Sequence, residues 1–235
     1  MSSFFYSNNM IGGYGGENIL NGCSIAVNQG EISVIVGPNG AGKSTAMKAM
    51  LGMLELSQGK VILDNKDISK LSPQDRVAAG ISFVPQTSNI FSELTVKENL
   101  EMGAYLRDDD LNKTFEELYS LFPILYEKKD QMAGELSGGQ RQQVAVGRAL
   151  MTQPIVLMLD EPTAGVSPLV MDELFEKILD IKNKGVAVII VEQNAKQALS
   201  IADYGYVLVE GKNKFNGKGI ELLNDKEVRK AFLGG

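Results

Sequence analysis

Histidine is absent from the 235 residues of this chain, and cysteine occurs once, at Cys23. Without histidine the chain lacks the side chain that most often acts as a general base, and it has no His-based metal site. Any acid–base chemistry must therefore fall to carboxylates. A single cysteine cannot form an intrachain disulfide, which fits a reducing compartment, and the simplest interpretation of Cys23 is a small buried core residue.

The chain also lacks an excess of basic residues and any long apolar run. Its 23 Lys and Arg against 29 Asp and Glu give a formal net charge of −6, which argues against a general nucleic-acid-binding surface. No apolar run reaches the length of a membrane-spanning helix, and the polar, uncharged segment Met1–Met10 does not read as a signal peptide. We therefore expect a soluble chain whose membrane role comes through a partner.

Segments typical of strands and helices alternate along the chain, which predicts an α/β fold. Continuous apolar or β-branched runs indicate buried strands, expected at Ile32–Val36, Lys60–Leu63, Ile81–Val84, Ile155–Leu159, Val186–Val191 and Tyr206–Val209. Helix-start signals predict helices over Lys43–Leu51, after Ser72 as far as Gly80, and after Thr95, which forms a capping box with Glu98.

The stretch from Ser88 to Glu135 differs in composition, because it has few β-branched runs and many Leu, Glu and Lys residues. We predict a helical subdomain over residues 88–135, inserted into an α/β core made of residues 1–87 and 136–235. The whole chain, residues 1–235, is then one domain. The acidic run Asp108–Asp110 within the subdomain is expected to be a solvated loop.

A glycine-rich segment follows the first predicted core strand. Residues Gly37–Ser44 read Gly-Pro-Asn-Gly-Ala-Gly-Lys-Ser and match G-x-x-x-x-G-K-[ST]. Small residues let backbone N–H groups approach phosphate oxygens, and the following helix adds the positive end of its dipole. Lys43 then contacts the β- and γ-phosphates and Ser44 binds Mg²⁺; the alternative is a glycine-rich turn with a chance lysine. The predicted ATP-binding residues are Gly37, Pro38, Asn39, Gly40, Ala41, Gly42, Lys43, Ser44 and Thr45.

Two carboxylates end the predicted strand Ile155–Leu159. Asp160, at the strand end, is placed to hold Mg²⁺ directly or through water. Glu161 points the other way and is the best candidate for the base that orients or deprotonates the attacking water. In isolation the pair would simply be solvated acids. The phosphate loop on the same kind of sheet favours a site, because ligands collect at the carboxyl ends of parallel strands.

Leu136–Gln140 reads Leu-Ser-Gly-Gly-Gln, and the three motifs in this order and spacing resemble the ABC ATPases over nearly the whole chain. The resemblance implies a P-loop NTPase core with a mostly parallel sheet, an N-terminal antiparallel β part and an inserted helical subdomain. It also implies that a helix start carrying Ser137, Gly138, Gly139 and Gln140 contacts the γ-phosphate of an ATP held by a second subunit. A flexible turn is the alternative interpretation of this segment.

Further positions match the family one at a time. Tyr14 lies where an aromatic residue stacks on adenine, although an ordinary turn would also suit it. Gln86 corresponds to the glutamine that contacts Mg²⁺ and relays the nucleotide state to the helical subdomain. Ser167 stands where many members carry an aspartate at the dimer contact. Gln193 occupies the switch position, where most members have a catalytic histidine. It could instead merely start the next helix, for which Asn194 already provides a cap.

Three segments narrow the resemblance to one subgroup, the second ATPase subunits of bacterial branched-chain amino-acid importers and their relatives for urea and short amides. These segments are Glu161–Pro168, Val191–Ala195 and Ala231–Gly235. The subgroup implies an ATPase that works as a heterodimer or homodimer with a second ABC ATPase subunit. Its partners are permease subunits at the cytoplasmic face of the membrane and, indirectly, an extracytoplasmic substrate-binding protein, with no nucleic acid.

Two other functions stay open. A non-transport ABC ATPase, acting in DNA repair or on ribosomes, would usually carry a coiled-coil insertion, a second fused cassette or basic extensions, and the sequence shows none of these. A regulatory ATPase would act on a soluble partner instead of a membrane protein. We favour the transport motor on the resemblance. No residue is expected to contact the transported molecule.

Overall fold

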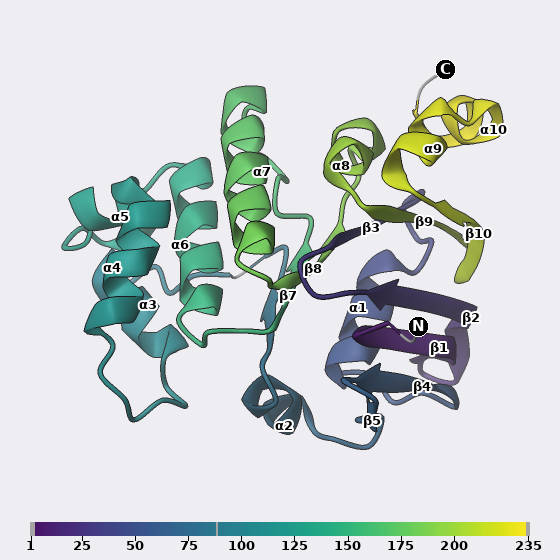
Figure 1. The fold of residues 1–235 in the computed structure, drawn as a ribbon, viewed down its shortest axis with the longest axis horizontal. Coiled ribbons are helices and arrows are strands. Elements are labelled where there is room, and N and C mark those ends of the chain that lie inside the picture. The colour runs from purple at the N-terminus through teal and green to yellow at the C-terminus, as the bar shows by residue number, and fades with distance from the viewer. Residues whose placement is uncertain (1–2, 88, 234–235) are drawn as a thin grey trace.

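The structure is a computed structural model that describes residues 3–87 and 89–233. Ser88, where the helical subdomain was expected to begin, lies outside the described residues, as does the end of the Ala231–Gly235 segment at Gly234 and Gly235. The strands form two sheets (Figure 1). The antiparallel sheet has the order β2-β1-β4-β5, with β1 Phe5–Tyr14, β2 Glu17–Val27, β4 Gln58–Leu63 and β5 Lys66–Asp67.

The other sheet has the order β10-β9-β3-β8-β7-β6, and all its neighbouring strands are parallel except β9 and β10. Its strands are β3 Ile32–Val36, β6 Ile81–Val84, β7 Val156–Asp160, β8 Ala187–Val191, β9 Tyr204–Val209 and β10 Lys212–Gly217. The predicted α/β fold, with its mostly parallel sheet and N-terminal antiparallel part, is confirmed. The predicted strands recur with ends shifted by up to two residues.

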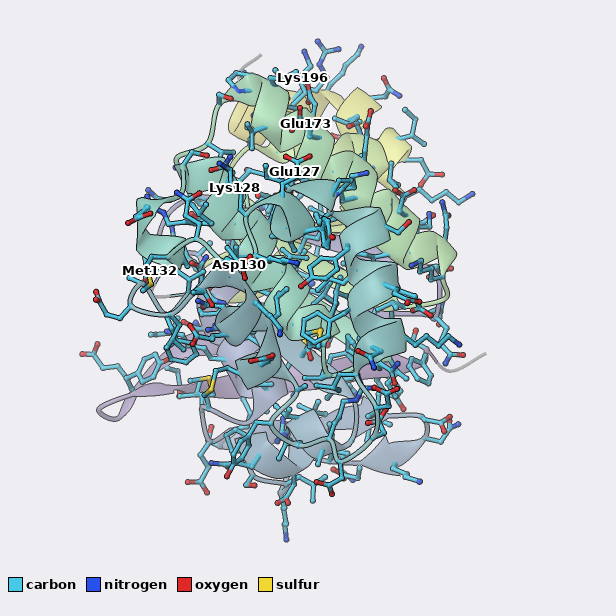
Figure 2. The ribbon with its side chains drawn as sticks, turned by 90° about the vertical axis from the view of Figure 1, so that its left-hand side faces the viewer. Glu127, Lys128, Asp130, Met132, Glu173 and Lys196 are labelled. Carbon is cyan, nitrogen blue, oxygen red and sulfur yellow. The ribbon has the colours of Figure 1, made fainter. Side chains whose placement is uncertain are left out.

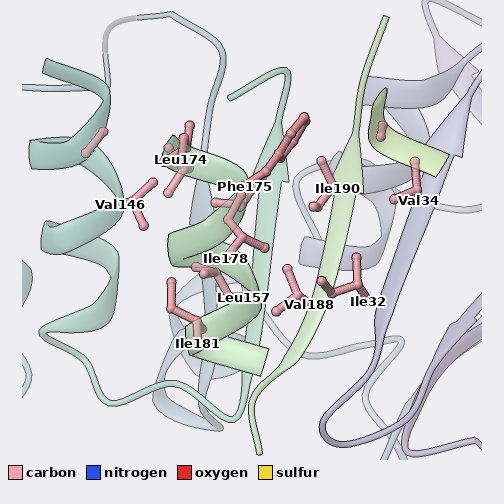
Figure 3. Packing of buried hydrophobic residues seen from close by; sticks show 14 of the residues in the cluster. Ile32, Val34, Val146, Leu157, Leu174, Phe175, Ile178, Ile181, Val188 and Ile190 are labelled. Atoms are coloured by element: carbon pink, nitrogen blue, oxygen red, sulfur yellow. The ribbon is translucent and has the colours of Figure 1, made fainter. Parts of the chain in front are cut away.

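The parallel sheet is covered on both faces, as the continuous apolar runs predict. Every residue of β3, β7 and β8 is buried. One face packs against α1 (Lys43–Leu51), while the other packs against α7 (Pro168–Asn183) and α8 (Ala195–Ile201). Figure 3 shows the second face, where side chains of α7 contact those of the strands, and their labelled members are Ile32, Val34, Leu157, Leu174, Phe175, Ile178, Ile181, Val188 and Ile190.

A layer of helices stands at the left of Figure 1. It contains α3 Val96–Gly103, α4 Asn112–Leu121, α5 Pro123–Glu127, the turn η1 Ala133–Glu135 and α6 Gly138–Leu150. At Gly147 of α6 an added Cβ would lie 2.8 Å from Leu125 Cδ1 and 3.1 Å from Leu100 Cδ2. The packing of α6 on these helices therefore carries the helical layer past residue 135, and the domain boundary there stays a prediction.

The predicted helix starts are confirmed by their caps. α2 (Pro73–Ala78) begins after Ser72, whose side chain accepts a hydrogen bond from Asp75 N. α3 begins after Thr95, which forms a capping box with Glu98. The described part of the chain ends with α9 Gly219–Asn224, α10 Lys226–Val228 and the short π-helix η2 Arg229–Leu233.

Asn99 of α3 is fully buried and fastens the segment that enters this helix. Its Oδ1 accepts from Phe91 N at 2.8 Å, and its Nδ2 donates to the carbonyls of Phe91 and Thr95, each at 2.9 Å. The turn from Phe91 to Thr95 is thus tied to α3 by a side chain that belongs to the helix.

The outer end of the helical layer carries charges of both signs. Figure 2 looks onto this end and labels exposed or half-exposed side chains from α5 and the turn after it, from α7 and from α8, namely Glu127, Lys128, Asp130, Met132, Glu173 and Lys196. Among the residues that the structure describes, none of the helices is both long and apolar enough to span a membrane.

Candidate active site

The carboxyl ends of β3, β7 and β8 meet at one edge of the parallel sheet, because these strands are neighbours with a common direction. A cavity of about 490 Å³ opens at this edge. Its lining residues are Ile19, Asn39, Gly40, Ala41, Gly42, Lys43, Ser44, Thr45, Gln86, Glu161 and Gln193. Residues predicted from four separate segments therefore lie around one space.

The backbone of the phosphate loop depends on glycine at two points. Gly37 has a φ of 149°, and an added Cβ would lie 2.2 Å from Leu208 O. Gly42 has a φ of 93° in the left-handed region and is the N-cap of α1, where no side chain caps the helix. The first N–H groups of α1 thus have no capping side chain to compete with an anion.

Lys43 is the first residue of α1 and only 6% exposed. Its Nζ donates to Gly37 O at 2.9 Å and to Pro38 O at 3.2 Å, so the ammonium group lies across the loop. Burial lowers the pKa of Lys43, and the nearby carboxylates of Glu161 and Asp160 oppose this effect. Three donors on one nitrogen can exchange these carbonyls for phosphate oxygens.

Ser44, which lines the cavity, is hydrogen-bonded to Asp160. Ser44 Oγ donates to Asp160 Oδ1 at 2.9 Å. Burial raises the pKa of Asp160, whereas the hydrogen bond from Ser44 lowers it. A hydroxyl and a carboxylate are hard oxygen ligands of the kind that Mg²⁺ takes. The two residues therefore fit a magnesium ion bound also by phosphate and water.

Glu161 adopts a φ of 48°, which is uncommon for a residue other than glycine. Its N–H donates to Val191 O at 2.9 Å, which ties the end of β7 to the end of β8. Its Oε2 accepts from Gln86 Nε2 at 2.7 Å. The two adjacent carboxylates thus have different partners, Ser44 for Asp160 and Gln86 for Glu161.

Gln193 lies two positions after the end of β8, directly after Glu192, and is exposed to the cavity. Its Nε2 donates to Asn39 Oδ1 of the phosphate loop at 3.5 Å. The next helix, α8, is capped by Asn194, whose side chain accepts from Gln197 N. The predicted cap is confirmed, and Gln193 is not needed for it. The amide of Gln193 instead lies beside the phosphate loop.

The signature segment and Tyr14 lie elsewhere, and neither is among the described residues that line this cavity. Ser137 is the N-cap of α6 and forms a reciprocal capping box with Gln140. Ser137 and Gly138 are exposed, while Gly139 is buried and packs against Val170 of α7. Tyr14 ends β1 and is 48% exposed. The chain therefore brings together only part of the predicted nucleotide site.

Two residues of the site were not predicted from the sequence. Ile19 of β2 lines the cavity because the antiparallel sheet lies over the phosphate loop, and no motif marks it. Glu192 is 2% exposed and accepts hydrogen bonds from Thr163 N, from Thr163 Oγ1 and from Gln193 N. Burial raises its pKa, and the bonds from Thr163 oppose that shift. An acid at the end of an apolar strand, directly before Gln193, was the available signal.

Comparisons with known proteins agree with this geometry. Residues 20–164 match the ABC transporter family. The high-affinity branched-chain amino acid transport ATP-binding protein BraG of Pseudomonas aeruginosa is 40% identical over 223 residues, covering 94% of this chain and 96% of BraG. The probable branched-chain amino acid transport ATP-binding protein LivF of Archaeoglobus fulgidus is 39% identical, with 94% and 95% coverage. The lipopolysaccharide export system ATP-binding protein LptB of Haemophilus influenzae is 34% identical, with 99% and 98% coverage.

Solved structures show the same fold. A nucleotide-free ATP-binding cassette from an ABC transporter superposes with a TM-score of 0.87 at 32% identity, covering 100% of both chains. The ADP conformation of MJ1267, an ATP-binding cassette of an ABC transporter, gives a TM-score of 0.86, also at 32% identity and 100% coverage of both chains.

Proposed function

Because this chain belongs to the ABC transporter family, we propose that it is the ATPase subunit of an importer for branched-chain amino acids. The chain binds and hydrolyses ATP, and hydrolysis is coupled to transport. The observation that carries the proposal is the separation of the phosphate cavity from the signature segment within one chain. Each cavity then needs Ser137 and its neighbours from a second cassette, as a hetero- or homodimer arranged head to tail.

In this proposal the chemistry is divided between residues of the cavity, Tyr14 outside it and the signature segment of a second cassette. The phosphate loop and Lys43 bind the phosphates, Tyr14 stacks on the adenine, and Glu161 accepts the proton of the attacking water. The Gln193 amide is positioned beside the reacting phosphoryl group, and Ser137 with Gly138 of the second cassette completes the anion cradle. Ser44, Asp160 and Gln86 would hold Mg²⁺, which would supply positive charge to the phosphate oxygens.

A second surface suits the membrane partner. A groove of about 350 Å³ lies between the core and the helical layer, and its lining residues are Leu51, Val77, Ser82, Phe83, Phe91, Met102, Gly103, Ala145, Arg148, Ala149 and Thr152. Phe91 and Met102 are 46% and 47% exposed, with Arg148 stacked over the Phe91 ring at 4.8 Å. Gln86 follows Phe83 closely along the chain, lines the nucleotide cavity and bonds Glu161, so one segment connects this groove to that cavity.

The transported molecule is assigned from the relatives. Proteins named for branched-chain amino acid transport are 39–40% identical to this chain. LptB at 34% identity gives the second candidate, the motor of a lipopolysaccharide exporter. An importer for urea or short amides, a non-transport ATPase and a regulatory ATPase with a soluble partner predict other outcomes in the same assay.

The test is reconstitution with the products of neighbouring transporter genes. The chain should co-purify with permease subunits and a second cassette. Proteoliposomes containing ATP should then accumulate labelled leucine in the presence of the binding protein. Vesicles carrying Glu161→Gln form the matched control. Uptake of urea or acetamide alone, extraction of lipopolysaccharide, or failure to co-purify with any membrane subunit would each contradict the assignment.

A further inference from the structure

Glu192 lies where three strands of the parallel sheet end. Its N–H donates to Ile35 O of β3 at 3.1 Å, and it directly follows β8. Its side chain turns toward the segment after β7, where Oε1 accepts from Thr163 N at 3.0 Å and from Thr163 Oγ1 at 2.8 Å. Its Oε2 accepts from Gln193 N at 3.2 Å. The backbone and side chain of this one residue thus connect the strand ends that carry the phosphate loop, Glu161 and Gln193.

We infer that Glu192 is a positioning residue, which anchors the backbone of Gln193 to Thr163 and thereby sets where the Gln193 amide lies. The inference rests on the proposed role of Gln193 in hydrolysis. Glu192 itself is buried behind the cavity and is not among its described lining residues, so it acts through its neighbour and not on ATP.

The chemistry of the contacts favours a carboxylate over other buried residues. All three partners present hydrogens, namely two backbone N–H groups and one hydroxyl. Two carboxylate oxygens accept from all three, whereas an amide of the same size has one oxygen and one NH₂ group. Whichever way a glutamine is turned at residue 192, its NH₂ faces an N–H donor, either that of Gln193 or that of Thr163. Glu192→Gln therefore breaks the hydrogen-bonded link between Thr163 and Gln193 with almost no change in side-chain volume.

The alternative is a purely structural role, because a buried hydrogen-bonded acid can also stabilise the fold without affecting chemistry. The two roles differ in whether the effect passes through Gln193. A positioning residue loses its influence when the Gln193 amide is removed. A structural residue keeps the same influence with or without that amide.

The experiment is a mutant cycle on ATP turnover with Glu192→Gln, Gln193→Ala and the double variant. Glu192→Gln should lower kcat about 10-fold, as expected for one buried N–H left without an acceptor, with little change in KM for ATP. In the Gln193→Ala background the same change should alter kcat by less than about 2-fold. An equal fall in both backgrounds, or wild-type turnover of Gln193→Ala, would overturn the inference.

Thr163 keeps the test decisive if Glu192→Gln does not fold. Thr163→Val removes one donor to Glu192 and keeps the N–H, while Thr163→Ser keeps both and is the matched control. Thr163→Val should lower kcat several-fold, whereas Thr163→Ser should keep kcat near that of the wild type. The difference in kcat between these two variants should disappear in the Gln193→Ala background. Equal turnover of the valine and serine variants would contradict the anchor. The readout is ATP hydrolysis, so absence of amino-acid uptake would count only against the proposed importer.

Discussion

Helices α1 and α6 both begin at a glycine-rich segment with a serine, yet their first turns are finished differently. The first N–H groups of α1 have no side-chain cap, and buried Lys43 lies across the loop before them. The first turn of α6 is closed by its own capping box, in which Ser137 Oγ accepts from Gln140 N and Gln140 Oε1 accepts from Ser137 N. Only the first is built as a phosphate site within one chain.

The difference teaches how the work of the site is divided. The start of α1 can bind an anion alone, because its backbone donors, Lys43 and Ser44 all line one cavity, and Ser44 also bonds Asp160. The start of α6 exposes Ser137 and Gly138 on the surface, and neither is among the described residues that line this cavity. It is suited to complete a nucleotide site that another cassette has already formed.

The largest effect on kcat is expected from Glu161→Gln, which tests whether the groups that hydrolyse ATP lie at the cavity beside α1. Glu161→Gln should lower kcat by about 10²–10⁴-fold, because it removes the proposed base while an amide can still bond Gln86. ATP affinity should be retained, and an ATP-bound dimer should accumulate on size-exclusion chromatography. Turnover near that of the wild type would remove Glu161 as the base.

Mixing two inactive variants tests whether the starts of α1 and α6 contribute to one site from different chains. Lys43→Ala should lose ATP binding by its own chain, while Ser137→Arg should bind ATP but fail to close the dimer. Each variant alone should be inactive. A mixture of the two should recover measurable turnover, because a head-to-tail pair then contains one intact site. Mixing Lys43→Ala with itself serves as the control, and activity of either variant alone would contradict shared sites.

Substitution of Gln193, which lies beside the phosphate loop that precedes α1, should change the rate of hydrolysis by an intermediate amount. Gln193→Ala should slow hydrolysis roughly 10- to 1,000-fold if its amide acts as a preorganised donor. With no histidine in the chain, the wild-type rate should stay flat between about pH 6 and 7. Gln193→His should remain active and gain a pH dependence in that range, which a pH–rate profile would reveal. Wild-type turnover of the alanine variant at saturating ATP would leave Gln193 structural.

The smallest effect concerns the packing of α6. Gly139→Ala should lower the free energy of unfolding by about 1–3 kcal/mol, because its Cβ would lie 2.4 Å from Val170 Cγ1. Gly138→Ala is the matched control for stability, since the nearest atom to its Cβ is Gly165 O at 3.8 Å. Urea unfolding of both variants measures the difference. Equal stability would mean that α6 and α7 shift apart without penalty.

The sequence predicted most of the α/β core, because buried parallel strands are continuous apolar runs and helix starts carry local caps such as Thr95. It also predicted which segments would meet around the phosphate loop. Both successes rest on short-range patterns and on one rule about sheet edges. The roles assigned to Tyr14, Glu161 and Gln193 remain predictions.

Features that depend on distant packing were not predicted. Ile19 lines the cavity only because the antiparallel sheet lies over the phosphate loop. Glu192 reads as one more surface acid until Thr163, 29 positions away, is brought against it. The close packing of Gly147 of α6 on Leu125 is another such feature, because it depends on how helices cross and not on composition.

Asn99 has a mechanical consequence for transmission between the groove and the cavity. Because this buried side chain bonds both the N–H and the carbonyl of Phe91, the turn from Phe91 to Thr95 cannot bend independently of α3. If a permease segment binds the groove as we propose, a displacement of Phe91 would therefore move α3 with it. Loss of these Asn99 hydrogen bonds should therefore weaken the coupling of ATP hydrolysis to the permease while leaving nucleotide affinity intact.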